Sequence, residues 1–312
     1  MVVPLSAHGT LEPPKNRSGV GDCLDLVRLT PLMEQTRGTC EIKIGLIDGP
    51  VFLEHRDLAT ENISEVSGEF AGTCALSSSA ACKHGTFVAG MLLAKRGSPA
   101  PAICPGCSLL VRPIFHETNS TNGQMPSATP QQLASAIVET IDAGARIVNL
   151  SAAVVQPSAT GERELRSALD YAAQRAVIIV AAAGNQGVVG SSVITHHPWV
   201  VPVAACDRQG RPLSQSNLGG SIGRWGVLSP GENITSLGPQ GGPLTSNGTS
   251  VAAPFVTGTV ALLWSEFGIA SASDLLLAVR GDRGLSRMAI VPPLLDAWSA
   301  HKFLASRGFT VN

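Results

Sequence analysis

The sequence predicts an α/β fold, a three-layer sandwich in which helices cover both faces of a mainly parallel central sheet. Short apolar runs of strand length alternate with longer segments whose apolar residues recur at helical spacing. The short runs are continuously apolar, as expected for strands that are covered on both faces. Because strands and helices alternate along the chain, right-handed crossovers and a parallel sheet are the expected result.

Each element follows from this pattern in chain order. Leucines at helical spacing predict a helix within residues 25–34, which Pro31 limits. Five apolar runs are the expected strands: 42–47, 109–114, 146–150, 177–182 and 200–205. Four amphipathic segments are the expected helices between and after them: 85–95, 130–143, 162–175 and 249–266. Residues 271–280 and 292–306 are expected to be surface helices on this body.

Composition and charge restrict the class of protein. Residues 1–22 are polar, rich in Pro and Gly and without periodicity, so we expect a poorly ordered arm before a single domain over residues 23–312. The formal net charge of −1 predicts no nucleic-acid or anionic-membrane partner. No apolar run reaches the length of about 18 residues that a membrane span needs. The start does not resemble a secretory signal, so we expect a cytoplasmic monomer, or otherwise a mature form whose targeting segment has been removed.

Seven cysteines, an odd number, leave at least one thiol unpaired. Cys74 and Cys82 flank a short stretch of small residues and are candidates for closing a loop. Cys104 and Cys107 have the spacing of a zinc knuckle or a redox pair, but a structural zinc usually needs a second pair or histidines. We expect structural cysteines, reduced or locally bridged, with metal or redox chemistry as the alternative. No metal site and no required cofactor are predicted.

Two residues in the first third of the chain are candidates for proton transfer. Asp48 follows the strand 42–47, and open α/β sheets place their sites at the carboxyl ends of strands. His84 precedes Gly-Thr and a helix of small residues, and at a helix N-terminus the dipole would keep the imidazole neutral. A neutral imidazole is able to accept a proton. Taken alone, however, each residue is explained as well by a polar cap or a turn.

Two later residues have the features needed for acyl transfer. Ser250, in Asn247-Gly-Thr-Ser-Val-Ala-Ala-Pro, opens the helix 249–266, so its Oγ is expected to be exposed. Amides in a first turn lack intrahelical partners and are able to stabilise an oxyanion. Asn185, in Ala-Ala-Ala-Gly-Asn-Gln-Gly directly after a strand, offers a second donor through its side chain. The alternatives are a helix cap at Ser250 or Thr249 and a turn at Asn185.

All four motifs occur together in the order Asp, His, Asn, Ser, which caps and turns do not explain. They resemble the motifs of the subtilisin-like serine peptidases, and the order Asp, His, Ser is also that of this family. The resemblance covers roughly residues 42–264. It implies that Ser250 is the nucleophile, that His84 is the general base and that Asp48 orients His84. The oxyanion would lie between the Ser250 N–H and the Asn185 amide.

The same resemblance implies how a peptide would bind. Two segments look like the family's walls of the S1 pocket, which hold substrate as an added β-strand. Their residues are Leu150, Ser151, Ala152 and Ala153 in one wall and Ala182, Ala183 and Gly184 in the other. Asp57 resembles one ligand of the calcium site in secreted subtilisins. The Asn-rich loop of that site is absent, so a structural calcium is not expected.

Among these peptidases, the sequence is closest to those that mature ribosomally made peptides, notably the cyanobactin proteases. The Asp-Gly-Pro-Val that starts at Asp48 and the absence of room for a prodomain before Ile42 support this. Cyclising members carry a helical lid between Asp and His, but here the segment is short and rich in Ser, Ala and Gly. It therefore favours hydrolysis of a precursor peptide. A macrocyclase or transpeptidase is the alternative, and a silent peptide-binding scaffold is disfavoured because all four catalytic residues are present.

Overall fold

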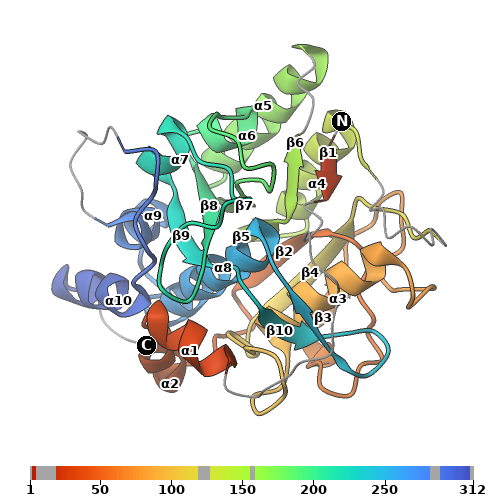
Figure 1. Ribbon diagram of the computed structural model, residues 1–312, viewed down its shortest axis with the longest axis horizontal. Coiled ribbons are helices and arrows are strands. Elements are labelled where there is room, and N and C mark those ends of the chain that lie inside the picture. Colours follow the sequence, from red (N-terminus) through yellow and green to blue (C-terminus); the bar gives the residue numbers. More distant parts are fainter. Residues whose placement is uncertain (1, 5–18, 119–126, 155–158, 282–288, 310–312) are drawn as a thin grey trace.

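The computed structural model describes residues 2–4, 19–118, 127–154, 159–281 and 289–309. Its centre is a sheet of seven strands in the order β3-β4-β2-β5-β7-β8-β9 (Figure 1). Every neighbouring pair in this sheet is parallel, so the predicted fold class is confirmed. The strands are β2 (Lys43–Asp48), β3 (Ile63–Glu65), β4 (Ser108–Pro113), β5 (Ile147–Leu150), β7 (Ile178–Ala182), β8 (Val200–Cys206) and β9 (Val227–Pro230).

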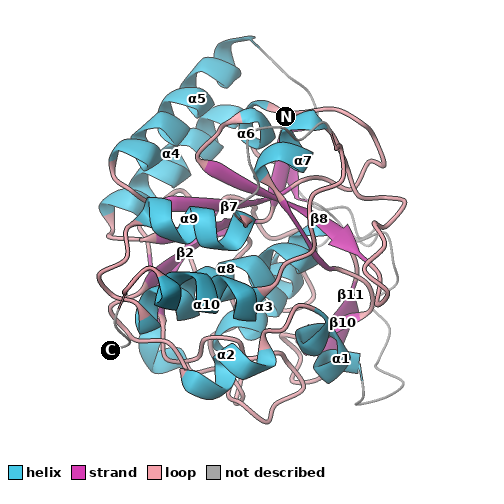
Figure 2. Ribbon diagram, turned by 90° about the vertical axis from the view of Figure 1, so that its left-hand side faces the viewer, coloured by secondary structure: helices cyan, strands magenta, loops and turns pink. Residues whose placement is uncertain are grey.

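Helices form a layer on each face of this sheet (Figure 2). One layer contains α3 (Ala80–Leu93) and α8 (Thr249–Glu266), and the other contains α4 (Pro130–Asp142) and α5 (Ala159–Gln174). Successive strand residues point to opposite faces. In β2, Ile44 and Leu46 join the core under α3 and α8, whereas Ile47 joins the core under α4. Both faces of the strands are therefore buried, which explains why the strand segments are apolar at successive positions.

The remaining helices refine the predicted boundaries. The expected helix within 25–34 is two helices, α1 (Gly19–Leu26) and α2 (Thr30–Gln35), separated by Arg28 with a φ of 51°. Pro31 lies in the first turn of α2, where a missing N–H costs nothing, so it begins a helix rather than limiting one. α9 (Ala272–Arg280) agrees closely with its prediction. α10 (Ala297–Ser306) begins only after its N-cap Asp296.

Several short elements were not predicted, because three or four residues carry too little periodicity to be recognised. They include β3 and β9 at the two edges of the sheet and the antiparallel hairpin of β10 (Ile234–Leu237) and β11 (Pro243–Ser246). Others are the 3₁₀ helix Thr60–Asn62, α6 (Val193–His196) and α7 (Gly220–Trp225). Among the helices that the structure describes, none combines the length and the apolarity that a membrane span requires.

The predicted N-terminal arm differs from the structure at both of its ends. β1 (Val2–Pro4) pairs antiparallel with β6 (Ala152–Val154), with Val2 opposite Val154 and Pro4 opposite Ala152 (Figure 1). Residues 19–22 form the start of α1. The rest of the arm, residues 1 and 5–18, lies outside the described residues. The main hydrophobic core extends from Cys23 to Leu304.

Candidate active site

Asp48 ends β2 and is completely buried. Its Oδ1 accepts a hydrogen bond from the Gly49 N–H at 2.7 Å and a second from Nδ1 of His84, also at 2.7 Å. A carboxylate that accepts this bond fixes the proton of a neutral imidazole on Nδ1 and leaves Nε2 as the acceptor. Nε2 of His84 lies 3.0 Å from Oγ of Ser250. The three side chains therefore form one hydrogen-bonded line.

His84 does not open its helix, contrary to the sequence-based expectation. α3 begins four residues earlier, at Ala80, so His84 lies beyond the orphan amides of the N-terminus. Burial lowers the pKa of His84, but the negative charge of Asp48 and its hydrogen bond more than offset this effect. The net result is a pKa above the ordinary value of 6.5. The raised pKa of this imidazole is therefore due to the charge and the hydrogen bond of Asp48 acting together against burial.

Glycines bring β2 and α3 close enough for this contact. A Cβ on Gly49 would lie 2.2 Å from the carbonyl oxygen of Ala81, and a Cβ on Gly85 would lie 2.4 Å from the carbonyl oxygens of Gly49 and Pro50. The backbone of the β2 terminus thus packs directly on the backbone of the first turns of α3. Asp48 directly precedes Gly49, and His84 directly precedes Gly85. This packing therefore sets the distance between Asp48 and His84.

Ser250 is the second residue of α8, whose boundaries match the prediction. The N-cap is Gly248 with a φ of 122°, and it provides no side-chain cap, so neither Ser250 nor Thr249 has the capping role considered above. Ser250 has 0% exposed surface, in contrast to the expectation that its Oγ is open to solvent. The His84 ring approaches it from α3, and Gly184 donates its N–H to Oγ1 of Thr249 at 3.2 Å, so both sides of this first turn are covered.

Asn185 is held by the residue that precedes Ser250. Its Oδ1 accepts hydrogen bonds from both the N–H and the Oγ1 of Thr249, each at 2.9 Å. Its Nδ2 is buried and has no hydrogen-bond partner within the described part of the chain. A Cβ on Gly248 would lie 2.5 Å from this Nδ2, so glycine leaves the space that the amide needs. An unpaired amide donor beside a serine at a helix N-terminus is suited to stabilising an oxyanion.

The predicted walls of the peptide-binding cleft lie at the same edge of the sheet. The register places Leu150 of β5 opposite both Ile47 of β2 and Ala181 of β7. Asp48, Ser151 and Ala182 are therefore the next residues on three adjacent strands. Leu150, Ser151, Ala182 and Ala183 are buried, and Gly184 has a φ of 118°. Ala152 and Ala153 belong to β6, whose backbone alone is described.

Sequence reasoning missed the polar residues that link these elements. Asn149 is completely buried in β5, donates from Nδ2 to Oγ of Ser151 at 3.0 Å and accepts from Oγ1 of Thr257 of α8 at 2.8 Å. It ties the end of β5 to the helix that carries Ser250. Asn149 could have been found from the sequence, because it is a lone asparagine within the apolar run Ile-Val-Asn-Leu. Asn217, which bonds to the segment around Asn185, had no comparable signal.

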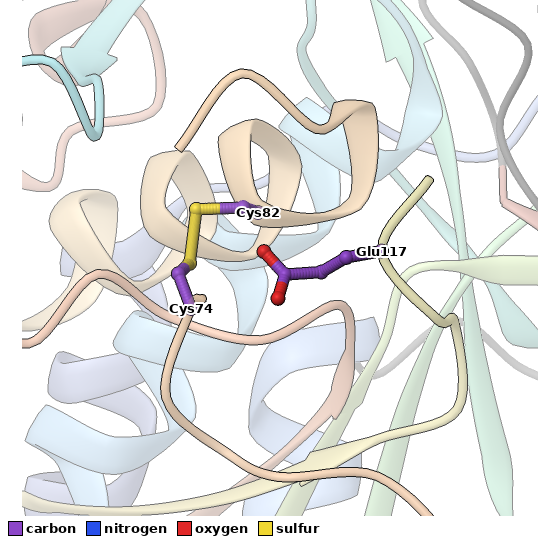
Figure 3. A group of neighbouring side chains, drawn as sticks. All are labelled: Cys74, Cys82 and Glu117. Atoms are coloured by element: carbon purple, nitrogen blue, oxygen red, sulfur yellow. A yellow bond between two sulfur atoms is a disulfide. The ribbon is translucent and has the colours of Figure 1, made fainter. Parts of the chain in front are cut away.

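Cys74 and Cys82 form a disulfide, one of the two states that the sequence left open. Figure 3 shows the carboxylate of Glu117 beside it. That carboxylate accepts the N–H groups of Ala75 and Leu76, both at 2.8 Å. Cys74, Cys82 and Glu117 are the only group of His, Cys, Asp or Glu side chains in the described ranges whose ligand atoms lie close enough together to hold a metal ion. Because two of them are joined in a disulfide, they lack the thiolates that bind metals. A disulfide is typical of oxidising compartments, and the cytoplasmic location expected from the sequence stays a prediction.

Cys104 and Cys107 are both buried free thiols, and among the residues that the structure describes no second pair of ligands lies beside them. Burial raises the pKa of Cys104, whereas a hydrogen bond from Cys104 lowers the pKa of Cys107. The Cβ of Gly38, if present, would lie 2.3 Å from Sγ of Cys107. The pair thus packs tightly in the main core, as expected for structural cysteines.

A buried carboxylate, an imidazole and a serine hydroxyl in hydrogen-bonded sequence, with an amide donor nearby, make up the machinery of a serine hydrolase. Here the acid lies at the end of a parallel strand and the serine at the start of a helix, in the chain order Asp, His, Ser. That order and architecture define the subtilisin type of serine peptidase rather than the chymotrypsin type.

Comparison with known proteins identifies the family. Residues 40–281 match the Subtilase family, and the chain belongs to this family of serine peptidases. Subtilisin DY of Bacillus licheniformis is 29% identical over 257 residues, which cover 80% of this chain and 86% of the relative.

Two solved structures are similar over most of the chain. The patellamide maturation protease PatA is 29% identical, with a TM-score of 0.70 and coverage of 87% of this chain and 98% of that chain. The prenylagaramide maturation protease PagA is 26% identical, with a TM-score of 0.74 and coverage of 88% and 98%.

Proposed function

We propose that this subtilase is an endopeptidase in which Ser250 attacks the scissile carbonyl and forms an acyl-enzyme. His84 takes the proton of Ser250 through Nε2 and later gives it to the leaving amine. Asp48 holds the Nδ1–H of His84 and stabilises the imidazolium. The observation that carries this proposal is the hydrogen-bonded line from Asp48 through His84 to Ser250, with distances of 2.7 and 3.0 Å.

The oxyanion is assigned to the Nδ2 donor of Asn185 and the backbone N–H of Ser250. Burial of an unpaired Nδ2 costs free energy in the resting protein. That cost is understandable if the partner of Nδ2 is the negative oxygen that develops only during the reaction. Removal of such a donor typically lowers turnover by about 10²–10³.

The substrate is proposed to bind as an added strand on β6, with its reacting residue between the segments that follow β5 and β7. The chain itself supports this proposal, because β1 pairs antiparallel with β6. The edge of β6 is thus able to accept an extended segment. From Val2 to Pro4, β1 runs from Val154 toward Ala152, that is, toward the level of Asp48 and Ser151.

The natural substrate is proposed to be a ribosomally made precursor peptide, cleaved to linear products. The names of PatA and PagA describe maturation proteases, and this chain covers 98% of each solved chain. Residues 49–79, all of them described, contain one 3₁₀ helix and β3 but no α-helix. This segment therefore provides no helical lid to exclude water from the acyl-enzyme, which favours hydrolysis over macrocyclisation.

A fluorophosphonate probe tests the nucleophile directly. The protein should be labelled at Ser250, with the adduct located by peptide mass spectrometry, and Ser250→Ala should abolish labelling. Ser214→Ala, on an exposed serine, is the matched control and should label normally. A folded sample that is not labelled would overturn the proposed role of Ser250.

A peptide library tests the reaction and its specificity. Incubation of the protein with random peptides, followed by mass spectrometry, should yield linear acids with a recurring residue before the cut. Cyclic or amine-captured products would establish the macrocyclase or transpeptidase instead. Saturable peptide binding without any product would support a silent scaffold.

A further inference from the structure

Asn217 is attached to the segment that contains Asn185 by five hydrogen bonds. It lies in the loop between β8 and α7, and its Nδ2 donates to the carbonyl of Ala183 at 3.2 Å and to Oε1 of Gln186 at 2.7 Å. Its Oδ1 accepts from the N–H of Gln186 at 3.0 Å and the N–H of Val188 at 3.2 Å. Its own N–H donates to the carbonyl of Gly184 at 2.9 Å. One residue thus holds the backbone on both sides of Asn185.

Close approach of this side chain requires the glycine at position 184. Gly184 has a φ of 118°, and a Cβ on it would lie 2.1 Å from Nδ2 of Asn217. The carboxamide therefore occupies space that any larger residue would fill. The exposed residues 186–190 are therefore held by hydrogen bonds to Asn217, whereas a surface loop is ordinarily more mobile.

The position of the Asn185 donor depends on two anchors. Thr249 fixes Oδ1 of Asn185, which sets the rotation of the carboxamide. The backbone from which the side chain extends is fixed from the other side, by Asn217. A displacement of that backbone would move Nδ2 away from the oxygen that it should bind, while leaving the line from Asp48 to Ser250 intact.

We propose that Asn217 is a positioning residue for the oxyanion donor, acting through Asn185 without touching the substrate. This inference rests on the proposed function and deepens it. The distances required of an oxyanion donor are narrow, about 2.7–3.1 Å, so a small displacement of the loop weakens stabilisation of the transition state. Binding of the substrate in the ground state depends much less on the position of this donor.

A double-mutant cycle tests this role. Asn217→Ala should lower kcat by about 10- to 100-fold, within the range for loss of an oxyanion donor, and change KM by less than about threefold. In the Asn185→Ala background, Asn217→Ala should cost no more than about twofold, because the donor that it positions is already gone. Gln186→Ala, which removes only one of the five bonds, is the control and should stay within about threefold of the parent.

The outcomes separate this inference from the proposed function. Equal losses in both backgrounds would show that Asn217 acts independently of Asn185 and would overturn the inference. If Asn185→Ala alone loses no activity, the oxyanion assignment fails, and the inference fails with it. In that case, labelling of Ser250 by the fluorophosphonate would still support Ser250 as the nucleophile. If Asn217→Ala does not fold, Asn217→Asp keeps the acceptor Oδ1 and loses both donations of Nδ2, to the Ala183 carbonyl and to Oε1 of Gln186. It should then show the same fall in kcat and the same dependence on Asn185.

Discussion

Thr249 holds the carboxamide oxygen of Asn185 with two donors, its N–H and its Oγ1, both at 2.9 Å. The residue directly before Ser250 therefore orients the amide that we assign to the oxyanion. Thr249→Val removes the hydroxyl at nearly constant volume and also frees the N–H of Gly184, which Oγ1 accepts. We expect kcat to fall about tenfold, which corresponds to about 1.4 kcal/mol of transition-state stabilisation.

The matched control is Thr249→Ser, which keeps the hydroxyl and should retain most of the activity. Steady-state kinetics on a peptide substrate measures both variants. A valine variant as active as the parent would mean that the N–H of Thr249 alone fixes Asn185.

Activity should decline on acidification with a midpoint above the ordinary histidine value of 6.5, because the charge of Asp48 and its hydrogen bond raise the pKa of His84 above that value. The neutral imidazole is the active form, and protonation as the pH falls through the raised pKa removes the base. Asp48→Asn removes that charge, so the midpoint should move down while the rate falls. The pH profile of kcat/KM measures this, with Asp57→Asn as a control that leaves the midpoint unchanged. A parent midpoint at or below 6.5 would contradict the assignment.

The Cys74–Cys82 disulfide should stabilise the segment that leads into α3. It joins residues eight positions apart, and Cys82 is two residues from His84. Closing a loop of this length contributes about 2–3 kcal/mol in the chain-entropy description. The double variant C74S/C82S should therefore unfold at a lower temperature than the oxidised parent, as measured by differential scanning calorimetry. Reductant should lower the Tm of the parent only; an equal effect on the variant would point to another cause.

Gly85→Ala should damage the site although alanine favours helices. Its Cβ would lie 2.4 Å from the carbonyl oxygens of Gly49 and Pro50, so α3 has to move away from β2. Overpacking of this kind costs about 1–3 kcal/mol, and the shift lengthens the contact between His84 and Asp48. Gly21→Ala is the matched helical control, since no atom lies within 4 Å of its Cβ position. Thermal unfolding and kcat should both fall for Gly85→Ala and neither for Gly21→Ala.

Displacing β1 should improve the binding of peptide substrates. β1 occupies the edge of β6 that we propose for the substrate, and Ser250 has no exposed surface. The double variant V2P/V3P removes both N–H donors, so it weakens the pairing whichever residue is the hydrogen-bonded one. We expect a lower KM for peptides that extend several residues before the cut, whereas V2A/V3A, which keeps the donors, should match the parent. An unchanged KM in V2P/V3P would show that β1 does not compete with substrate.

Much of the fold could be predicted because periodicity is a local property. The run 42–47 and the helix 249–266 correspond closely to β2 and α8. The apolar pattern of a buried strand or helix lies in consecutive residues, so it can be recognised without the rest of the fold. The ends of the helices and the shortest strands were less predictable. α3 begins at Ala80, within a stretch of small residues next to a disulfide, and β3 is only three residues long. The strand order and the pairing of β1 with β6 involve residues far apart in sequence, which no local pattern encodes.

The family, the order of the motifs and the candidates Asp48, His84, Asn185 and Ser250 were recognisable from the residues alone, because these chemical groups lie in distinctive local contexts. How these side chains are held follows from the folded arrangement. The 2.7 Å contact of His84 with Asp48, the bonds of Thr249 to Asn185 and the five bonds of Asn217 all join separate segments. The pKa of His84 is likewise decided by a partner from another element. Hydrogen bonds and charges act over a few ångströms in space, and only folding brings these residues within that range.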